Sequence, residues 1–108
     1  MIISGGENVY CTEVEDAIYT HPNVLEATVF GIPDERWGET VHAVVVLRAG
    51  FETLSAAGLI EHCRAQIAGY KVPRSISFQQ DPLPKSGPGK VLKRELRAPY
   101  WEGRDSQV

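Results

Sequence analysis

The sequence predicts an α+β domain in which helices pack against a small, mostly antiparallel sheet of three strands. Residues 25–29 alternate between apolar and polar side chains, residues 39–48 contain a β-branched run, and a short alternating segment follows near residues 76–78. Segments with helical spacing lie before, between and after these strands. A chain of 108 residues has the usual size for one hydrophobic core, so residues 1–108 are expected to form a single domain.

The first helix is expected to begin at Thr12 and to end before Pro22. Thr12 and Glu15 match a capping box, in which the Thr12 oxygen accepts a backbone N–H and Glu15 reaches back. Pro22 ends the helix because the residue before a proline avoids the helical region. The side chains that share one face of this helix are Val14, Ala17, Ile18 and His21.

Two neighbouring strands are expected after the first helix. One occupies residues 25–29 and ends at residues 31–34, where a glycine and a proline lie close together. The other spans about residues 39–48, and its valines at residues 44–46 indicate burial on both faces. We therefore expect this second strand to be the central one. The buried side chains expected on the first strand are Leu25, Ala27 and Val29.

A second helix, a third strand and a third helix complete the expected order. Ser55 is placed to cap a helix that runs to about Ala68. Residues 75–79 predict a short strand near an edge of the sheet. Residues 81–89 hold three prolines and two glycines, which predict a loop, and residues 91–98 predict a short final helix. The apolar side chains that share a face of the second helix are Ile60, Cys63 and Ile67.

Composition and charge exclude several classes of protein. The longest strongly apolar run, residues 43–47, is far too short to cross a bilayer, and no transmembrane segment is expected. The two cysteines, Cys11 and Cys63, are too few for a disulfide framework and indicate a reducing, cytoplasmic setting. Residues 1–47 carry eight acidic and one basic side chain, whereas residues 48–108 carry ten basic and six acidic ones. This asymmetry favours a local anionic ligand over general nucleic-acid binding.

The candidate catalytic residue is Lys90, at the end of the loop rich in glycine and proline. Gly87 and Gly89 precede it and are expected to give the loop the freedom that positions the lysine. The segment is no phosphate-binding P-loop, because Pro84 stands where that pattern needs glycine and Val91 where it needs serine or threonine. A single cation on a tether can stabilise charge that develops on a phosphoryl or carboxylate group. An ordinary lysine in a solvated surface loop remains the alternative.

Four other segments carry candidate binding residues, and three of them have a structural alternative. The glycine pair within residues 4–7 suits a backbone that lines a narrow channel, but also a hairpin turn. Trp37 can stack on a flat ligand or close the end of the core. Tyr70 and Lys71 combine an aromatic ring with a cation in a loop. The basic run at residues 93–97 can contact phosphates or form a solvated helix face.

Metal-dependent and hydrolytic chemistry are not expected of this chain. The three histidines and two cysteines have no spacing typical of a metal site. His62 and Cys63 are neighbours on the second helix and point about 100° apart. The spacing suggests no Ser/His/Asp set either.

Taken together, these segments resemble the C-terminal domain of the adenylate-forming enzymes, which include acyl-CoA synthetases, nonribosomal peptide adenylation domains and luciferases. The matching segments come in the family's order and span nearly the whole chain. They are residues 4–10 with 13–15, residues 21–24, residues 31–34 with 37–39, residues 70–73 and residues 84–97. Residues 5–10, GGENVY, are most similar to the branch that contains fatty-acyl-CoA and aryl-CoA ligases.

The resemblance implies a mobile lid in a two-step ligase that uses ATP and CoA. A carboxylate attacks ATP to give an acyl-adenylate and pyrophosphate, and the CoA thiol then displaces AMP. The lid rotates between the steps. Lys90 reaches the carboxylate and α-phosphate in the first step, and the glycine pair lines the pantetheine tunnel in the second. The residues implied to line the CoA and pantetheine channel are Ser4, Gly5, Gly6, Glu7, Trp37, Tyr70 and Lys71.

The resemblance also implies partners outside this chain. A large N-terminal adenylation domain would hold ATP, Mg²⁺ and the acyl pocket, so the isolated chain is expected to be inactive. Acyl-adenylate and CoA would be its small-molecule partners, and a lysine acetyltransferase and deacetylase would act on Lys90. The sequence departs from the family at Cys11, where proline is usual, and at Val72, where some relatives carry an arginine for CoA phosphate.

Two rival hypotheses remain open at this point. One is a stand-alone module that binds nucleic acid or an acidic partner through the basic residues 85–97. Overall acidity counts against this hypothesis, and nucleic acid is not an expected partner. The other is an accessory subunit that completes a separately encoded N-terminal domain in trans.

Overall fold

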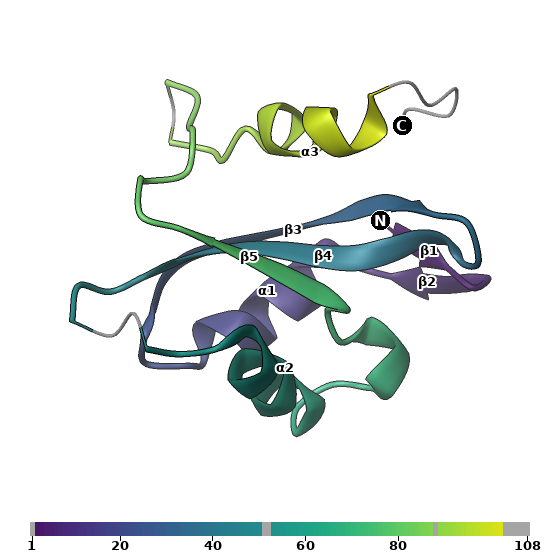
Figure 1. The fold of residues 1–108 in the computed structure, drawn as a ribbon, viewed down its shortest axis with the longest axis horizontal. Coiled ribbons are helices and arrows are strands. Elements are labelled where there is room, and N and C mark those ends of the chain that lie inside the picture. Colours follow the sequence, from purple (N-terminus) through teal and green to yellow (C-terminus); the bar gives the residue numbers. More distant parts are fainter. Residues whose placement is uncertain (1, 51–52, 88, 103–108) are drawn as a thin grey trace.

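The computed structural model describes residues 2–50, 53–87 and 89–102, whose elements form three layers (Figure 1). Helices α1 (Cys11–Tyr19) and α2 (Ala56–Arg64) cover one face of a central sheet, and helix α3 (Lys93–Trp101) covers the other. The strands are β1 (Ile2–Ser4), β2 (Glu7–Val9), β3 (Val24–Asp34), β4 (Gly38–Leu47) and β5 (Ser75–Gln79), and a 3₁₀ turn η1 spans Gly69–Lys71. The predicted α+β class is confirmed.

Strand β4 is the centre of the sheet, as its sequence predicts. It pairs antiparallel with β3 on one side, and on the other it pairs antiparallel with β1 and parallel with β5. The prediction of only three strands was wrong, because β1 and β2 add an N-terminal hairpin and bring the sheet to five. Each of these two strands has three residues, too few for an alternation to show in the sequence.

The consecutive valines of β4 fill two separate apolar layers, which confirms their expected burial on both faces. Val45 packs in the larger core between the sheet and helices α1 and α2. Val44 and Val46 point to the opposite face, where they pack with Phe30 and Leu83 beneath the segment that leads to α3. The α3 side of the sheet is therefore held by its own small core.

The predicted capping box at the start of α1 is wrong. The helix is capped by Tyr10, which has an extended backbone and makes no side-chain cap bond. Instead of reaching back along the helix, the Glu15 carboxylate accepts the backbone N–H of Val29 at 2.8 Å and the Thr28 hydroxyl at 3.3 Å. A backbone donor on the adjacent strand thus replaces the local partner. The buried residues of the helix are, as expected, Val14, Ala17 and Ile18, whereas His21 lies beyond its end.

Two predicted details of β3 are also wrong. Leu25 is 48% exposed, because the pairing with β4 shifts register between Val24 and Glu26 and turns Val24 into the core instead. Residues 31–34 do not end the strand but belong to it, and Asp34 is its last residue. The turn that follows is short, since Gly38 already begins β4.

The second and third helices begin and end at different residues than predicted. The Ser55 hydroxyl accepts the Gly58 N–H at 3.0 Å, which confirms the predicted cap, but α2 ends at Arg64, before Ala68. Helix α3 begins at Lys93 and continues through Pro99 to Trp101. The buried indole of Trp101 donates to the Gly31 carbonyl at 2.8 Å and so anchors the helix to β3.

His42 lies in a buried polar cluster that joins β4 to β5 and α3. The residue is only 3% exposed. Its Nδ1 is 2.6 Å from Ser75 Oγ, and its Nε2 is 3.2 Å from both Ser77 Oγ and Tyr100 OH. Burial lowers the pKa of His42 below the ordinary value of 6.5, so the fold holds the neutral ring.

We expect the free energy of unfolding to fall as the pH drops through the ordinary histidine pKa of 6.5. In that window the unfolded chain binds a proton that folded His42 does not, so the free energy of unfolding rises with pH. Below the lowered pKa of the folded state both states bind the proton, and the contribution of His42 no longer changes with pH. Urea unfolding between about pH 7.5 and 5.5 measures the slope. His42→Asn should flatten it without abolishing it, since burial and nearby His62 also lower the pKa of His21. An unchanged slope in the variant would contradict this expectation.

Candidate functional site

Lys90 lies beside the turn of a short hairpin whose described residues are 84–87 and 89–92. The Ser86 N–H donates to the Lys90 carbonyl at 2.8 Å, and the Gly89 N–H donates to the Ser86 carbonyl at 2.9 Å. Gly89 has φ of +92°, a conformation that favours glycine. Gly87 has no positive φ, and a Cβ there would meet nothing within 4 Å, so the geometry requires glycine only at Gly89.

The Lys90 side chain is exposed and available to an external anion. Its ammonium makes no hydrogen bond or ion pair with any residue that the structure describes. By contrast, Lys85 and Lys93 on either side of it are each paired with a glutamate. Lys90 is therefore an exposed cation on the surface of the domain, as its sequence context predicts.

A second group of candidate residues surrounds the turn between β1 and β2. Gly5 has φ of +59°, and a Cβ built on it would lie 2.6 Å from Cε3 of the Trp37 ring. The Gly5 N–H also donates to the Trp37 carbonyl at 2.9 Å. Asp34 holds the tryptophan in place by accepting its backbone N–H at 2.9 Å. Ser4, Gly6 and Glu7 lie in or beside the same turn.

Trp37 is flanked by two guanidinium groups that sequence reasoning did not single out. The Arg36 and Arg74 Cζ atoms lie 5.0 and 4.7 Å from a Trp37 ring centroid, within the range of cation–π contact. Neither group has a carboxylate partner among the described residues. The signal for Arg74 was its place three residues after Lys71, in the same loop that carries the aromatic ring and the first cation.

Tyr70 and Lys71 form the 3₁₀ turn η1, which packs beside β2. The Lys71 ammonium donates to both Glu13 oxygens, at 2.9 and 3.0 Å, and lies 5.6 Å from the Tyr70 ring centroid. The hydrogen bond that Lys71 donates to Glu13 raises the pKa of Lys71. Lys71 is thus already neutralised within the domain, whereas Tyr70 is exposed and can meet a ligand.

The two groups lie at opposite ends of the molecule. Figure 1 shows the loop between β5 and α3 at one end of the sheet, and β1 and β2 at the other. The longest dimension of the described chain is 40 Å. Gly5, Trp37, Tyr70 and Lys71 are brought together, while Lys90 stands apart, so one fixed orientation cannot present both groups to the same small active site.

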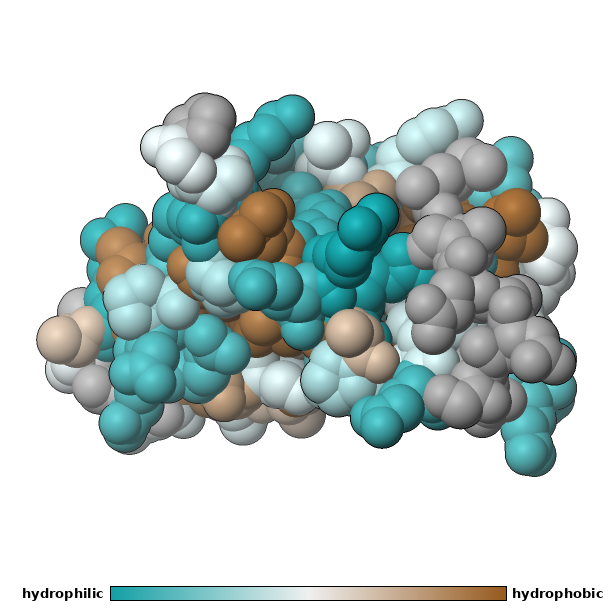
Figure 2. All heavy atoms as spheres, turned by 90° about the horizontal axis from the view of Figure 1, so that it is seen from above, coloured by the Kyte–Doolittle hydropathy of each residue, from teal (hydrophilic) through white to brown (hydrophobic). Residues whose placement is uncertain are grey.

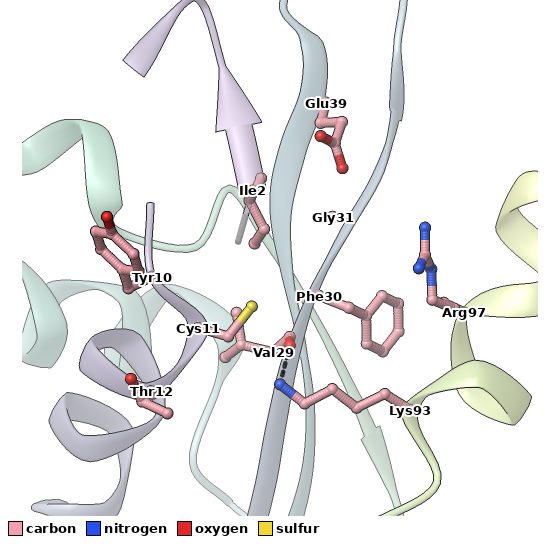
Figure 3. A pocket seen from close by; sticks show the side chains of 10 residues that line it. All are labelled: Ile2, Tyr10, Cys11, Thr12, Val29, Phe30, Gly31, Glu39, Lys93 and Arg97. Carbon is pink, nitrogen blue, oxygen red and sulfur yellow. Dashed lines mark hydrogen bonds between the residues drawn. The ribbon is translucent and has the colours of Figure 1, made fainter. Parts of the chain in front are cut away.

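The open pocket in Figure 3 is lined by Lys93 and Arg97 of the basic run, but by none of the residues expected to serve catalysis or the CoA channel. It has a volume of about 510 Å³ and lies between the start of α1, β3 and α3. Lys93 reaches across it and donates to the Val29 carbonyl at 2.8 Å, and the Cys11 sulfur points into it. Figure 2 shows mostly hydrophilic side chains on the α3 face, with apolar side chains only in separate spots.

Residues 2–50, 53–87 and 89–102 contain neither a metal-binding cluster nor a membrane-spanning helix. No group of three or more histidine, cysteine, aspartate or glutamate side chains there could hold a metal ion. None of the helices in those ranges is long and apolar enough to span a membrane. Both cysteines are free thiols.

Comparison with known proteins identifies close relatives of this fold and sequence. Residues 13–90 match the family described as AMP-binding enzyme C-terminal domain. A feruloyl-CoA synthase from Amycolatopsis sp is 50% identical over 97 residues, which cover 90% of this chain and 19% of that protein. Long-chain-fatty-acid–CoA ligase FadD13 from Mycobacterium tuberculosis is 44% identical over 100 residues, covering 93% of this chain and 19% of the ligase.

A solved structure agrees with these sequence relatives. The Mycobacterium tuberculosis fatty acyl CoA synthetase has a TM-score of 0.85 and 43% identity to this chain, and the match covers 93% of this chain and 19% of that one. The chain thus spans about a fifth of the length of the relatives that it matches.

Proposed function

The chain belongs to the family of AMP-binding enzyme C-terminal domains, and we propose that it is the mobile lid of an AMP-forming acyl-CoA synthetase. The enzyme would join a carboxylate to ATP, releasing pyrophosphate, and then transfer the acyl group from AMP to the CoA thiol. Its large N-terminal adenylation domain would be the main partner of this domain. The observation that carries the proposal is the placement of two features at opposite ends of the sheet: a lysine without a partner among the described residues, and a glycine turn.

In the adenylation step Lys90 would be the catalytic residue. Its ammonium offsets negative charge as the substrate carboxylate approaches the α-phosphate of ATP, two anions that otherwise repel each other. The exposed position of Lys90, without a partner among the described residues, supports this role because no internal bond has to break first. Gly89 would help by allowing the tight turn that points the lysine outward. Gly87 would contribute freedom of the loop.

In the thioester step the other end of the domain would face the active site. The backbone of Gly5 and Gly6 would line the pantetheine tunnel, since a turn without side chains leaves room for a slender chain. Exposed Tyr70 and the face of Trp37 would contact the CoA nucleotide, with Ser4 and Glu7 beside them. Lys71 would have to leave Glu13 to bind phosphate. Arg36 and Arg74 have no carboxylate partner among the described residues and are therefore the readier phosphate ligands.

Magnesium would accompany ATP in the N-terminal domain. The described part of this chain has no donor set that fits the ion. We also propose a cytoplasmic location, which the two free thiols support.

The rival hypothesis of a nucleic-acid-binding module receives less support from the geometry. Of the basic residues between 85 and 97, Lys85 and Lys93 are neutralised by glutamates, and the Arg97 guanidinium lies 5.2 Å from the Trp101 ring centroid. Fewer charges remain for a phosphate backbone than the sequence implies.

We expect the polypeptide read through its upstream coding region to catalyse exchange between ATP and pyrophosphate only when a suitable carboxylate is present. A panel of aliphatic and aromatic acids tests this and identifies the substrate class, and adding CoA should give the matching thioester. The isolated chain serves as the inactive control. Folded polypeptide that shows no exchange with any acid, but binds duplex DNA with steep salt dependence, would favour the rival module instead.

A further inference from the structure

Two glutamates outside the predicted site hold the two ends of the hairpin that carries Lys90. Glu26, on β3, accepts the backbone N–H of Leu83 at 3.0 Å through Oε1 and pairs with the Lys85 ammonium through Oε2. Lys85 also donates to the Leu83 carbonyl at 3.1 Å. One carboxylate thus binds both the backbone and a side chain of the segment that enters the hairpin.

Glu15, on helix α1, holds the other end of the hairpin. Its Oε2 lies 2.8 Å from the Lys93 ammonium and accepts the Val29 N–H at 2.8 Å. Lys93 in turn donates to the Val29 carbonyl, the bond drawn as a dashed line in Figure 3. The first residue of α3, three positions after Lys90, is therefore joined to α1 and to β3 at once.

Both pairs are partly withdrawn from water, which distinguishes them from an ordinary surface ion pair. The Glu26 and Glu15 side chains are 19% and 17% exposed, whereas those of Glu61 and Arg64 in an exposed pair on α2 are 72% and 57% exposed. Exposed pairs hold geometry weakly, but a sheltered carboxylate that also accepts a backbone N–H is costly to displace. The bond from Lys85 lowers the pKa of Glu26, which keeps the carboxylate ionised.

Apolar packing fixes the base of the hairpin between these two pairs. Leu83 is buried with Phe30 and the valines of β4, and Val91 packs against the same layer. Across the hairpin, Lys85 and Val91 face each other as an isolated antiparallel bridge. The direction in which Lys90 projects therefore depends on how firmly Lys85 and Lys93 are held.

We propose that Glu26 and Glu15 are positioning residues for Lys90, which act by holding Lys85 and Lys93 on the two sides of the hairpin. The inference rests on the proposed role of Lys90 in adenylation. It predicts that these carboxylates matter for the first half-reaction and not for the second, because the glycine turn lies at the other end of the sheet.

The experiment uses the polypeptide read through its upstream coding region and measures the two half-reactions separately. Glu26→Ala and Glu15→Gln should each lower the rate constant of acyl-adenylate formation by roughly tenfold, with little change in the KM for ATP, because a misplaced catalytic group lowers turnover. Thioester formation from preformed acyl-adenylate should stay within about twofold. Retention of that second step also shows that each variant is folded.

Two further variants sharpen the test. The charge-exchanged double variant Glu26→Lys with Lys85→Glu should recover part of the adenylation rate lost in Glu26→Lys alone, because it restores the ion pair but not the acceptor for the Leu83 N–H. The matched control Glu61→Gln breaks the exposed pair with Arg64 and should change neither half-reaction. Hydrogen exchange of residues 83–92 should speed up in Glu26→Ala and not in Glu61→Gln.

The outcomes separate this inference from the proposed function. If Lys90→Ala abolishes adenylation but the glutamate variants do not affect it, the positioning role is overturned and the lid function stands. Equal losses in both half-reactions would reveal a general loss of structure and would also overturn it. If Lys90→Ala itself leaves adenylation intact, the proposed function fails together with the inference.

Discussion

Replacing Lys90 with alanine is expected to reduce carboxylate-dependent ATP–pyrophosphate exchange by about a hundredfold to a thousandfold, the usual effect of losing one charge-stabilising group. The lysine is exposed and without a partner in the described part of the chain, so its removal costs the fold little. The loss should therefore appear in turnover and not in stability. Thioester formation from preformed acyl-adenylate should change little, because the glycine turn that serves it lies at the other end of the sheet.

Two comparisons complete the test of Lys90. Lys90→Arg keeps the charge but changes its shape and reach, so it should restore only part of the exchange activity. Acetylation of Lys90 removes the charge and should act like the alanine variant. If an enzyme acetylated at every Lys90 retained full exchange activity, neither the catalytic role nor regulation by an acetyltransferase would stand. If both half-reactions fell together in Lys90→Ala, the two-orientation mechanism would lose its support.

The elements that sequence predicts well here are those determined by local chemistry. The valines of β4 require burial on both faces, and Ser55 caps α2 through a hydroxyl three residues from its donor. Glu15 shows where this reasoning fails. Its spacing from Thr12 satisfies a local motif, but the folded chain offers it a backbone N–H on β3 and the Lys93 ammonium, 78 residues away. Partners so distant in sequence leave no local signal.

In the candidate site, too, local features could be predicted from the sequence, whereas contacts between distant segments could not. The sequence singles out Lys90, Gly5 and Trp37 one by one, because an unusual loop, a glycine pair and an indole in a polar loop are local features. That Gly5 and Trp37 touch, while Lys90 stands at the far end, follows only from the register of β1 and β4. The hydrogen bond from the Leu83 N–H to Glu26 joins residues 57 positions apart, so it too leaves no local signal in the sequence.

Gly5→Ala is expected to impair the thioester step by roughly tenfold to a hundredfold while leaving exchange between ATP and pyrophosphate nearly unchanged. An alanine Cβ would lie 2.6 Å from the Trp37 ring, closer than real contacts allow, and would also have to adopt φ of +59°. The ring or the turn must therefore move. Either movement displaces the backbone proposed to line the pantetheine tunnel, and shifts of about 1 Å are known to cost this much.

The contribution of the steric clash can be separated from that of backbone strain. Gly6 also has a positive φ, of +84°, but an added Cβ there would meet nothing within 4 Å, so Gly6→Ala measures the strain alone. The double variant Gly5→Ala with Trp37→Ala removes the ring that the new methyl group strikes. If the clash is the cause, Gly5→Ala should lower the thioester rate less in the Trp37→Ala background than in the wild type. Equal losses in the two backgrounds would show that the turn conformation, and not its contact with Trp37, determines the CoA-facing surface.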